Sequence, residues 1–370
     1  MSRPSRWSRR AVLRGGAALL ASGFGRTGVA SHAGQYTPVL PGEPLRFPHD
    51  HGNHPGFRTE WWYVTGWLDH AEEPLGFQVT FFRTSPPVDR GNPSAFAPRE
   101  ILLAHAAVSQ AGYGRLRHAD RILRTGFGLA GAGTGRTHVW LDAWRLEQAI
   151  EDPQRFRTII DAPSFGLDLT LQATRPPLPQ GEAGFSQKGP DPRSASYYYS
   201  LPQLAVAGRL RMEQRTLPVR GRAWFDHEWS SEAMDAEAVG WDWIGINLDD
   251  GGVLMAFRMR GRSTLQHWGG GTWERPDGTR RTFGPNDIAW APLIHWQSPR
   301  TGTRYPVGFR VTAGSLTIDI EALMPDQEND ARRSAGTVYW EGAVRAVAEG
   351  RRVGAGYLEL TGYWKPLRLG

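Results

Sequence analysis

The sequence predicts an all-β protein, mostly antiparallel, built from two related domains. From Glu60 onward, short segments rich in aromatic and β-branched residues are separated by turns rich in Gly, Pro and Asp, a pattern typical of strands. Beyond the first 33 residues, no stretch of a dozen residues carries the apolar stripe of an amphipathic helix. A motif that begins at Trp61 also recurs at Trp241. We therefore expect less than about a tenth of the mature chain to be helical.

The strands of the first half can be placed in order along the chain. Residues 60–68 and 76–82 flank a short polar turn and predict a hairpin. Along residues 137–146, side chains alternate between two sets, one of which contains two Trp. This alternation predicts one strand with an aromatic face. Residues 175–193 are rich in Pro and Gly and predict a long loop, which within a domain often covers a site. Further strands are expected at residues 101–109, 166–174, 196–200 and 204–212.

An internal repeat defines the expected domains. Residues 61–69 match residues 241–249, and each copy is followed by a second strand, at residues 76–82 and 252–258. Self-similarity over such a distance indicates two copies of one β-barrel-like unit. Turn signals at residues 249–252 and 276–278 predict hairpins in the second copy. We expect an N-terminal domain over residues 34–232 and a C-terminal domain over residues 233–370.

The first 33 residues have the features of an export signal. Residues 8–14 resemble the twin-arginine motif, and a weakly apolar run at residues 15–24 is too short to span a bilayer. Small residues offer cleavage after Ala30 or Ala33. We expect a twin-arginine signal peptide over residues 1–33, a periplasmic or secreted protein, and no transmembrane segment in the mature chain.

Composition excludes several classes of function. The chain has no cysteine, so disulfides, thiolate metal sites and a cysteine nucleophile are excluded. The formal net charge of +6 comes from the leader, because residues 1–33 hold six Arg and no acid, and 6 − 6 leaves zero. A nucleic-acid partner is therefore not expected.

The stretch from residue 221 to residue 250 carries the chemistry. It combines Trp224, Trp229, Trp241 and Trp243 with Asp226, His227, Glu228 and Asp242. A carboxyl group beside indole rings is poorly solvated, so its pKa rises and it becomes a usable general acid near neutral pH. The structural alternative is a core strand whose Asp226 and Glu228 form the solvated face.

The segment before the first strand contains a His-rich pattern. His49, His51 and His54 form a His-x-His-x-x-His sequence in a loop rich in Pro and Gly. Metal ligation is one interpretation, but a hydrogen-bonded or solvated loop is favoured because the spacing is unspecific. We expect no metal and no cofactor.

Four motifs resemble the lipocalin-like carotenoid 1,2-hydratase superfamily, and more narrowly its branch of exported attachment-protein-like or "predicted hydrolase" members. They are EWWYVTG at residues 60–66, SYYYS at 196–200, AWFDHEWSS at 223–231 and GYLELTGY at 356–363. The resemblance implies two lipocalin-like antiparallel β-barrel domains in tandem. It also implies a hydratase that adds water to an apolar isoprenoid or lipid-like substrate, without a cofactor. The hydratase strand itself does not contain the sequence Asp-His-Glu-Trp-Ser-Ser.

Alkene hydration gives each candidate residue a role. Asp226 would donate the proton, while His227, Glu228 or Asp242 would hold the water. Trp224, Trp229, Trp241 and Trp243 would supply apolar walls that stabilise a carbocation. The remaining substrate contacts expected are Trp61, Trp62, Tyr63 and Tyr198. We expect Asp226 and Asp242 to lie together near the domain junction, at the mouth of a Trp-lined cavity.

Two other functions remain open from the sequence. A hydrolase is disfavoured because neither a Gly-x-Ser-x-Gly elbow nor a His-Glu-x-x-His motif occurs. The main alternative is a non-catalytic periplasmic carrier of a lipid or prenyl compound, or an accessory protein of a transporter, since lipocalin-like barrels often enclose an apolar cavity. The expected partner in either case is an apolar small molecule, with a transporter as a second candidate.

The leader gives a first testable prediction. Replacing Arg9 and Arg10 with Lys should block export, because the twin-arginine pathway recognises the Arg pair. Cell fractionation and N-terminal sequencing should find wild-type protein outside the cytoplasm and starting near Ser31 or Gly34. An uncut wild-type protein retained in the cytoplasm would contradict the assignment.

Overall fold

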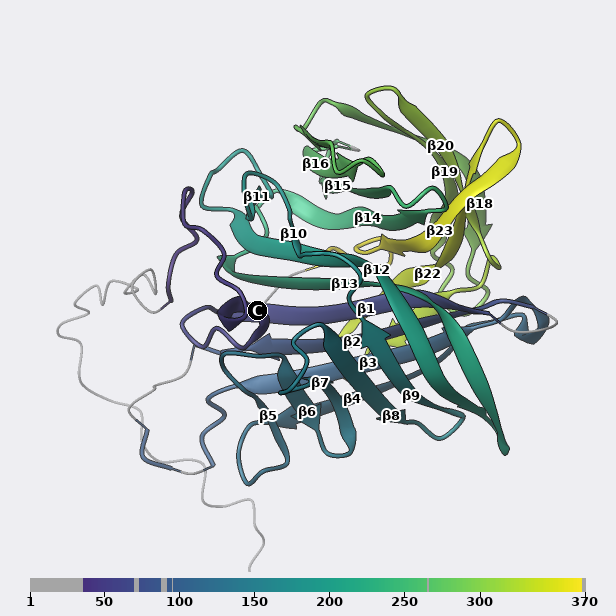
Figure 1. Cartoon of the computed structure of the whole chain (residues 1–370). Helices are drawn as coiled ribbons and strands as arrows, with labels where there is room; N and C mark the ends of the chain where they lie inside the picture. The colour runs from purple at the N-terminus through teal and green to yellow at the C-terminus, as the bar shows by residue number, and fades with distance from the viewer. Residues whose placement is uncertain (1–35, 70–72, 88–91, 95, 265, 368–370) are drawn as a thin grey trace, which may run out of the picture. The chain divides into compact units, whose positions relative to one another are not determined.

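The protein folds into two curled antiparallel sheets, a nearly closed barrel and a half-barrel (Figure 1). The structure, a computed structural model, describes residues 36–69, 73–87, 92–94, 96–264 and 266–367. Strands make up 59% of the structure and helices 2%, which confirms the predicted all-β fold. Within these described residues there are two short 3-10 helices, η2 (His49–His51) and η3 (Ala111–Tyr113). The predicted signal peptide lies outside the described residues.

The first sheet contains thirteen strands, and its main path runs β4-β3-β2-β1-β13-β12-β9-β8-β7-β6-β5, with β10 and β11 paired to β12. Their bounds are β1 (Thr59–Asp69), β2 (Leu75–Thr84), β3 (Ile101–Ser109), β4 (Arg117–Arg124), β5 (Ala130–Ala132), β6 (His138–Leu141), β7 (Trp144–Gln148), β8 (Arg155–Asp161), β9 (Phe165–Gln172), β10 (Leu178–Pro179), β11 (Phe185–Gln187), β12 (Ala195–Met212) and β13 (Arg215–Glu232).

The second sheet contains ten strands in the order β17-β16-β15-β14-β23-β22-β20-β19-β18, with β21 paired to β22. Their bounds are β14 (Ala238–Leu248), β15 (Val253–Gly261), β16 (Trp268–Glu274), β17 (Arg280–Phe283), β18 (Ile288–Gln297), β19 (Arg304–Ala313), β20 (Leu316–Ala322), β21 (Glu328–Ala331), β22 (Thr337–Ala348) and β23 (Arg351–Leu360).

The sheet order matches the internal repeat. In the first sheet β1 lies between β2 and β13, and in the second sheet the equivalent strand β14 lies between β15 and β23. The predicted boundary at residues 232 and 233 falls between β13 and β14. Both hairpins predicted in the second half are present, joining β14 to β15 and β16 to β17.

One strand prediction was wrong. Residues 137–146 form not one strand but the hairpin of β6 and β7, because Asp142 adopts a left-handed backbone with φ of 54° and turns the chain. Asp can occupy this region at modest cost, and side-chain alternation alone does not reveal it. The Pro- and Gly-rich segment is a loop that carries β10 and β11 along β12.

Side-chain alternation divides the apolar residues among three main cores. Along β1, Trp62 and Val64 pack inside the first barrel, whereas Tyr63 and Trp67 face the second sheet. Along β14, Ile244 packs inside the second sheet while its neighbour Trp243 faces the first. The third core therefore lies between the sheets, at the junction of the two halves.

Polar contacts and close backbone approach hold this junction together. The Nε1 of Trp67 on β1 donates to the carbonyl of Gly356 on β23 at 2.9 Å, and the Nδ2 of Asn247 donates to the carbonyl of Ala223 at 3.1 Å. At Gly76 on β2, an added Cβ would lie only 2.5 Å from the Cβ of Ala343 on β22. A side chain at this position would therefore force the two sheets apart.

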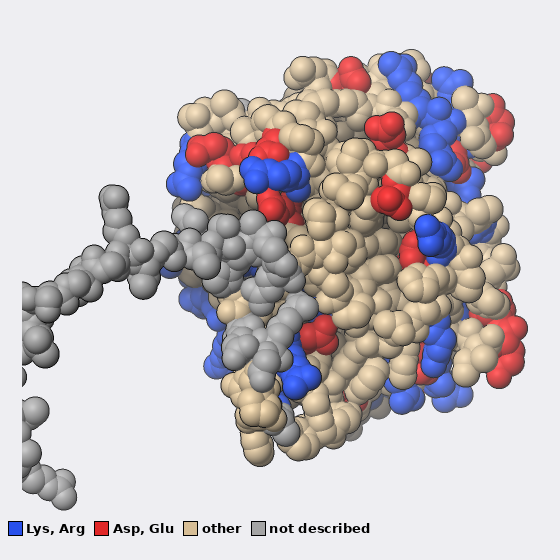
Figure 2. Space-filling view, turned by 90° about the vertical axis from the view of Figure 1, so that its left-hand side faces the viewer, with Lys and Arg blue, Asp and Glu red and all other residues tan. Residues whose placement is uncertain are grey.

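Acidic and basic side chains are mixed on the face of the molecule drawn in Figure 2. Figure 2 shows one face of the molecule, on which Lys and Arg are interspersed with Asp and Glu toward the edges and uncharged residues occupy the centre. No broad basic patch covers this face. Within the described part of the chain, no helix has the length and apolarity needed to cross a membrane.

We predict that Gly76→Ala lowers the free energy of unfolding by about 1–3 kcal/mol, because overpacking a close contact is destabilising. Denaturant unfolding followed by Trp fluorescence measures the change. Gly284→Ala is the matched control, since its added Cβ would meet its nearest atom at an ordinary 3.4 Å. Equal stability of the two variants would contradict the close packing of β2 on β22.

Candidate active site

The junction between the sheets encloses a cavity of about 400 Å³. It is not the interior of either barrel, because both interiors are filled by apolar cores. Its walls are mainly aromatic and aliphatic, with a few acids and one lysine among them. The residues that matter for its chemistry are Trp61, Tyr63, Lys188, Tyr198, Asp226, Glu228, Trp241, Trp243, Phe257, Tyr339, Glu341 and Glu359.

Asp226 lies on β13 with its carboxyl group buried at the cavity wall. Its Oδ1 accepts hydrogen bonds from the Ser200 hydroxyl at 2.6 Å and from the Trp224 Nε1 at 2.6 Å. Its Oδ2 accepts from the Tyr198 hydroxyl at 2.7 Å, and the Trp243 Nε1 donates in turn to that hydroxyl at 3.1 Å. The carboxyl group is therefore held in one orientation by three donors.

Burial raises the pKa of Asp226 to about 7, although the hydrogen bonds from Ser200, Tyr198 and Trp224 oppose the rise. The ionised form loses its hydration at a site that is 3% exposed, and three donors do not replace that hydration fully. Near neutral pH the group therefore exchanges a proton readily, as a general acid must.

A second pair of acids lines the same cavity. Glu341 on β22 is directly opposite Glu359 on β23, and the Glu341 side chain is buried while that of Glu359 is half-buried. Burial and the charge of Glu359 hold the pKa of Glu341 well above its usual range. Burial also raises the pKa of Glu359 to about 7, against the hydrogen bond that the Trp241 Nε1 donates at 2.9 Å. Two neighbouring carboxyls in such a site cannot both ionise cheaply.

Hydroxyl groups surround this second pair. Tyr63 and Tyr339 lie beside Glu341, and burial raises the pKa of both phenols well above the usual value. Within the described residues, the Tyr63 hydroxyl and the Glu341 Oε1 are buried without a completed hydrogen bond. Buried polar atoms of this kind need a partner, so this end of the cavity is suited to a hydroxyl group or a water.

A lysine from the Pro- and Gly-rich loop closes one side. The Lys188 Nζ forms an ion pair with Glu228 at 2.9 Å. The same ammonium lies 4.4 Å from the ring centroid of Phe257 and 4.8 Å from that of Tyr198. The cavity wall therefore already holds one cation against aromatic faces.

Side chains alternate along a strand, so the expected site residues fall into two groups, one facing the cavity and one facing the first barrel. Asp226, Glu228, Trp61, Tyr63, Tyr198, Trp241 and Trp243 line the cavity, and Trp224 supports Asp226 from behind. Trp62, His227 and Trp229 instead point into the first barrel, where Trp62 stacks on His227 at 4.8 Å between ring centroids. The His227 Nε2 donates a hydrogen bond to the Glu60 carboxylate at 2.9 Å, and His227 itself does not line the cavity.

The expected position of Asp242 was wrong. Asp242 lies outside the cavity lining, because Trp241 and Trp243 face the junction and the residue between them faces the second half-barrel. There it forms ion pairs with Arg258 at 2.7 Å and Arg260 at 3.1 Å. Asp242 therefore belongs to an ion-pair network of the second sheet and does not accompany Asp226.

Sequence reasoning missed Glu341, Glu359 and Lys188. The signal for Glu359 is an acid between two apolar residues of a strand, Leu358 and Leu360, which point into the second core. Such an acid must face the other side of the sheet, and only the packing of the first sheet against that side shields it from solvent. Two groups that could hold a metal, one of His49, Asp50 and His54 and one of His54, Glu60 and His227, lie toward the first barrel.

The fold and the site define a lipocalin-like β protein with a mainly apolar, acid-containing cavity between its two sheets. The AttH-like family profile matches residues 38–363, and the chain belongs to that family. A crystal structure of an AttH protein from Nitrosomonas europaea is 46% identical, with a TM-score of 0.83 over 88% of this chain and 99% of that chain.

More distant solved structures share the fold. Kievitone hydratase from Nectria haematococca is 14% identical, with a TM-score of 0.66 over 89% of this chain and 96% of that chain. CghA is also 14% identical, with a TM-score of 0.56 over 88% of this chain and 95% of that chain. The comparison with curated proteins gave no match.

We predict that Asp226→Asn stabilises the protein increasingly as the pH rises from about 4 to about 7. The native pKa of about 7 lies above the ordinary 3.8, so native Asp226 binds more protons than unfolded Asp226 in this window. The free energy of unfolding of the wild type therefore falls as the pH rises, and Asp226 accounts for up to a few kcal/mol of this fall. The isosteric Asn cannot ionise, so the variant does not suffer that loss.

Urea unfolding at pH 5 and pH 8 tests this prediction. Asp168→Asn is the control, because the hydrogen bond from Arg157 lowers the pKa of that exposed carboxyl. The control should show no gain with rising pH. A pH-independent difference between wild type and Asp226→Asn would show that the pKa of Asp226 is ordinary.

Proposed function

We propose that the protein catalyses an acid-dependent hydration of an apolar, isoprenoid or lipid-like alkene, with Asp226 as the proton donor. The observation that carries this proposal is a carboxyl group with a pKa of about 7, fixed by three hydrogen bonds, at the wall of a mainly apolar cavity. The apolar walls favour an apolar substrate, and the raised pKa favours proton transfer near neutral pH.

Asp226 can supply the proton of the reaction and take it back, so the hydration needs no other reactant than water. The Asp226 carboxyl transfers its proton to one alkene carbon, which forms a C–H bond and leaves a carbocation on the other carbon. A water oxygen bonds to the cationic carbon, and the proton released from that water returns to the Asp226 carboxylate. Glu341 and Glu359 hold the water or a hydroxyl group of the substrate, because their raised pKa values let a protonated carboxyl act as a hydrogen-bond donor.

The aromatic wall supports the intermediate. Phe257 and Tyr198 hold the Lys188 ammonium at 4.4 and 4.8 Å, so faces of this kind stabilise positive charge here. Trp241 and Trp243 offer further faces to a carbocation, each contact contributing on the order of 0.5–2 kcal/mol. The twin-arginine motif at Arg9 and Arg10 supports a periplasmic or secreted site for the reaction.

The experiment uses farnesol, geranylgeraniol and squalene as probes in water enriched in heavy oxygen. We expect an alcohol carrying the heavy isotope, detected by mass spectrometry, from wild-type protein. The rate should fall as the pH rises through about 7, because the donor loses its proton. Asp226→Asn should lower the rate about a hundredfold or more, the size of a lost general acid.

Asp319→Asn is the matched control, since Asp319 pairs with Arg310 on the outer surface of the second sheet at 2.7 Å. Its rate should equal that of wild type. Binding of the probes without labelled product, with equal affinity in wild type and Asp226→Asn, would contradict hydration and favour the carrier function. Equal product formation by both proteins would exclude Asp226 as the donor.

A further inference from the structure

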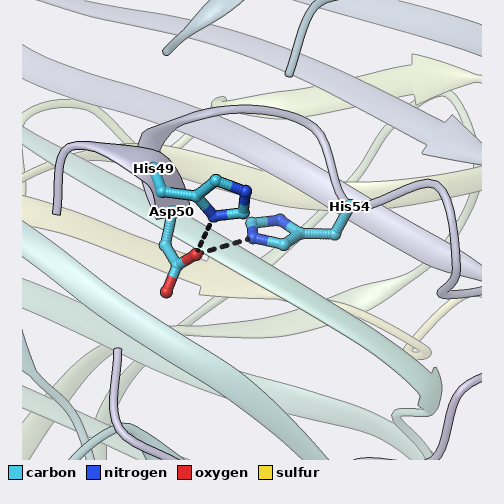
Figure 3. A group of neighbouring side chains, drawn as sticks. All are labelled: His49, Asp50 and His54. Atoms are coloured by element: carbon cyan, nitrogen blue, oxygen red, sulfur yellow. Dashed lines mark hydrogen bonds and ion pairs between the residues drawn. The ribbon is translucent and has the colours of Figure 1, made fainter. Parts of the chain in front are cut away.

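The segment that precedes β1 brings three metal-binding side chains together. His49 and Asp50 lie on η2, and His54 follows one short turn later (Figure 3). The Asp50 Oδ1 is 2.7 Å from the His49 Nδ1 and 3.4 Å from the His54 Nε2. All three donor atoms lie within 4.8 Å of one another. Imidazole nitrogen and carboxylate oxygen are ligands that zinc and similar divalent ions take in proteins.

Two of the three ligands are held from behind. The Asp50 Oδ2 accepts the backbone N–H of Arg46 at 2.6 Å, which leaves the Oδ1 directed at the two imidazoles. The His54 Nδ1 lies 2.7 Å from the Glu60 Oε1, so the Nε2 is the nitrogen presented to the cluster. Glu60 is itself fixed by the Arg83 Nε at 3.0 Å. A carboxylate behind a histidine is the arrangement that orients imidazole ligands in metal sites.

Packing and exposure also suit a metal. The His54 ring stacks on Trp229 with 3.8 Å between centroids and 6° between planes, which fixes the direction of its nitrogens. The His49 side chain is 68% exposed, so an ion and a further ligand can reach the cluster from solvent. The ion pairs of buried Asp50 are with His49 and His54, and a divalent cation would supply positive charge that neutral imidazoles lack.

The neighbouring group around Glu60 is a poorer metal site. The Glu60 Oε2 is occupied by the Arg83 guanidinium, and the Oε1 lies within hydrogen-bond distance of both His54 and His227. Glu60, Arg83 and His227 are fully buried, so a cation would have to displace a satisfied hydrogen-bond network. This network is the support for the outer site.

We propose that the His49 Nδ1, the Asp50 Oδ1 and the His54 Nε2 bind one divalent transition-metal ion of the zinc class. Tetrahedral zinc with ligands at about 2.0–2.2 Å separates neighbouring donor atoms by roughly 3.3 Å. The present 3.4 Å between Asp50 and His54 fits this separation, and the 2.7 Å contact between His49 and Asp50 would widen. The fourth position is open to water. Bound metal would fasten the segment before β1 to the first barrel, apart from the chemistry of the cavity.

The test uses the full chain, purified without a histidine tag and stripped with a chelator. Isothermal titration with Zn²⁺ should show one site per chain, and Co²⁺ should give the strong visible absorption of a tetrahedral site. Zn²⁺ should also raise the melting temperature by mass action. His49→Ala should weaken Zn²⁺ binding more than about tenfold, at least as much as losing a supporting group behind a ligand.

His49 is exposed, so its substitution should leave the fold intact, and Asp50→Asn is the second variant. His295→Ala, which removes an exposed histidine on β18, is the control and should bind Zn²⁺ like wild type. The proposal fails if wild type does not bind Zn²⁺ at micromolar concentration. It also fails if His49→Ala and Asp50→Asn both keep the wild-type affinity and Co²⁺ spectrum.

Discussion

The packing of two sheets face to face is the constraint on which the rest of the structure depends. Where the strands β1, β13, β14, β22 and β23 cross the junction, one face lies in a barrel core and the other faces the opposite sheet, so little of either face meets water there. Such strands must be apolar on both sides unless a polar group has a specific partner. Asp226, Glu341 and Glu359 are polar groups on the junction face, and their raised pKa values follow directly from this double burial.

The junction also explains how the acids are tolerated. Indole N–H groups contribute to the support: Trp224 donates to Asp226 and Trp241 donates to Glu359. An indole gives one hydrogen bond while presenting a large apolar surface, so the same residue supports the acid and forms a wall of the cavity. The high Trp content therefore serves polar support as much as apolar packing. Protonation of the acids offsets the remaining cost of burial near neutral pH.

The two faces of β13 carry polar groups with different roles. Its junction side carries Asp226 at the cavity, and its barrel side carries His227, which joins Glu60 and Arg83 in a buried network. That network supports His54 and so extends to the His49 and Asp50 cluster near the surface. One strand thus supports both the proposed catalytic cavity and the proposed metal site, but through opposite faces and separate hydrogen bonds.

The all-β class, the repeat of the two halves and the choice of Asp226 as a candidate acid could be predicted from the sequence, because strand periodicity and residue type are local properties. The prediction failed for Asp142, whose left-handed backbone splits a predicted strand, and for Asp242, whose salt bridges with Arg258 and Arg260 place it in the second half-barrel. The position of the cavity between the sheets could not be predicted from the sequence, nor could the presence of Glu341, Glu359 and Lys188 in its wall. Alternation gives a strand two faces, but which face meets the second sheet depends on contacts between distant parts of the chain. Trp67 with Gly356 and His105 with Tyr339 are such contacts, 289 and 234 positions apart.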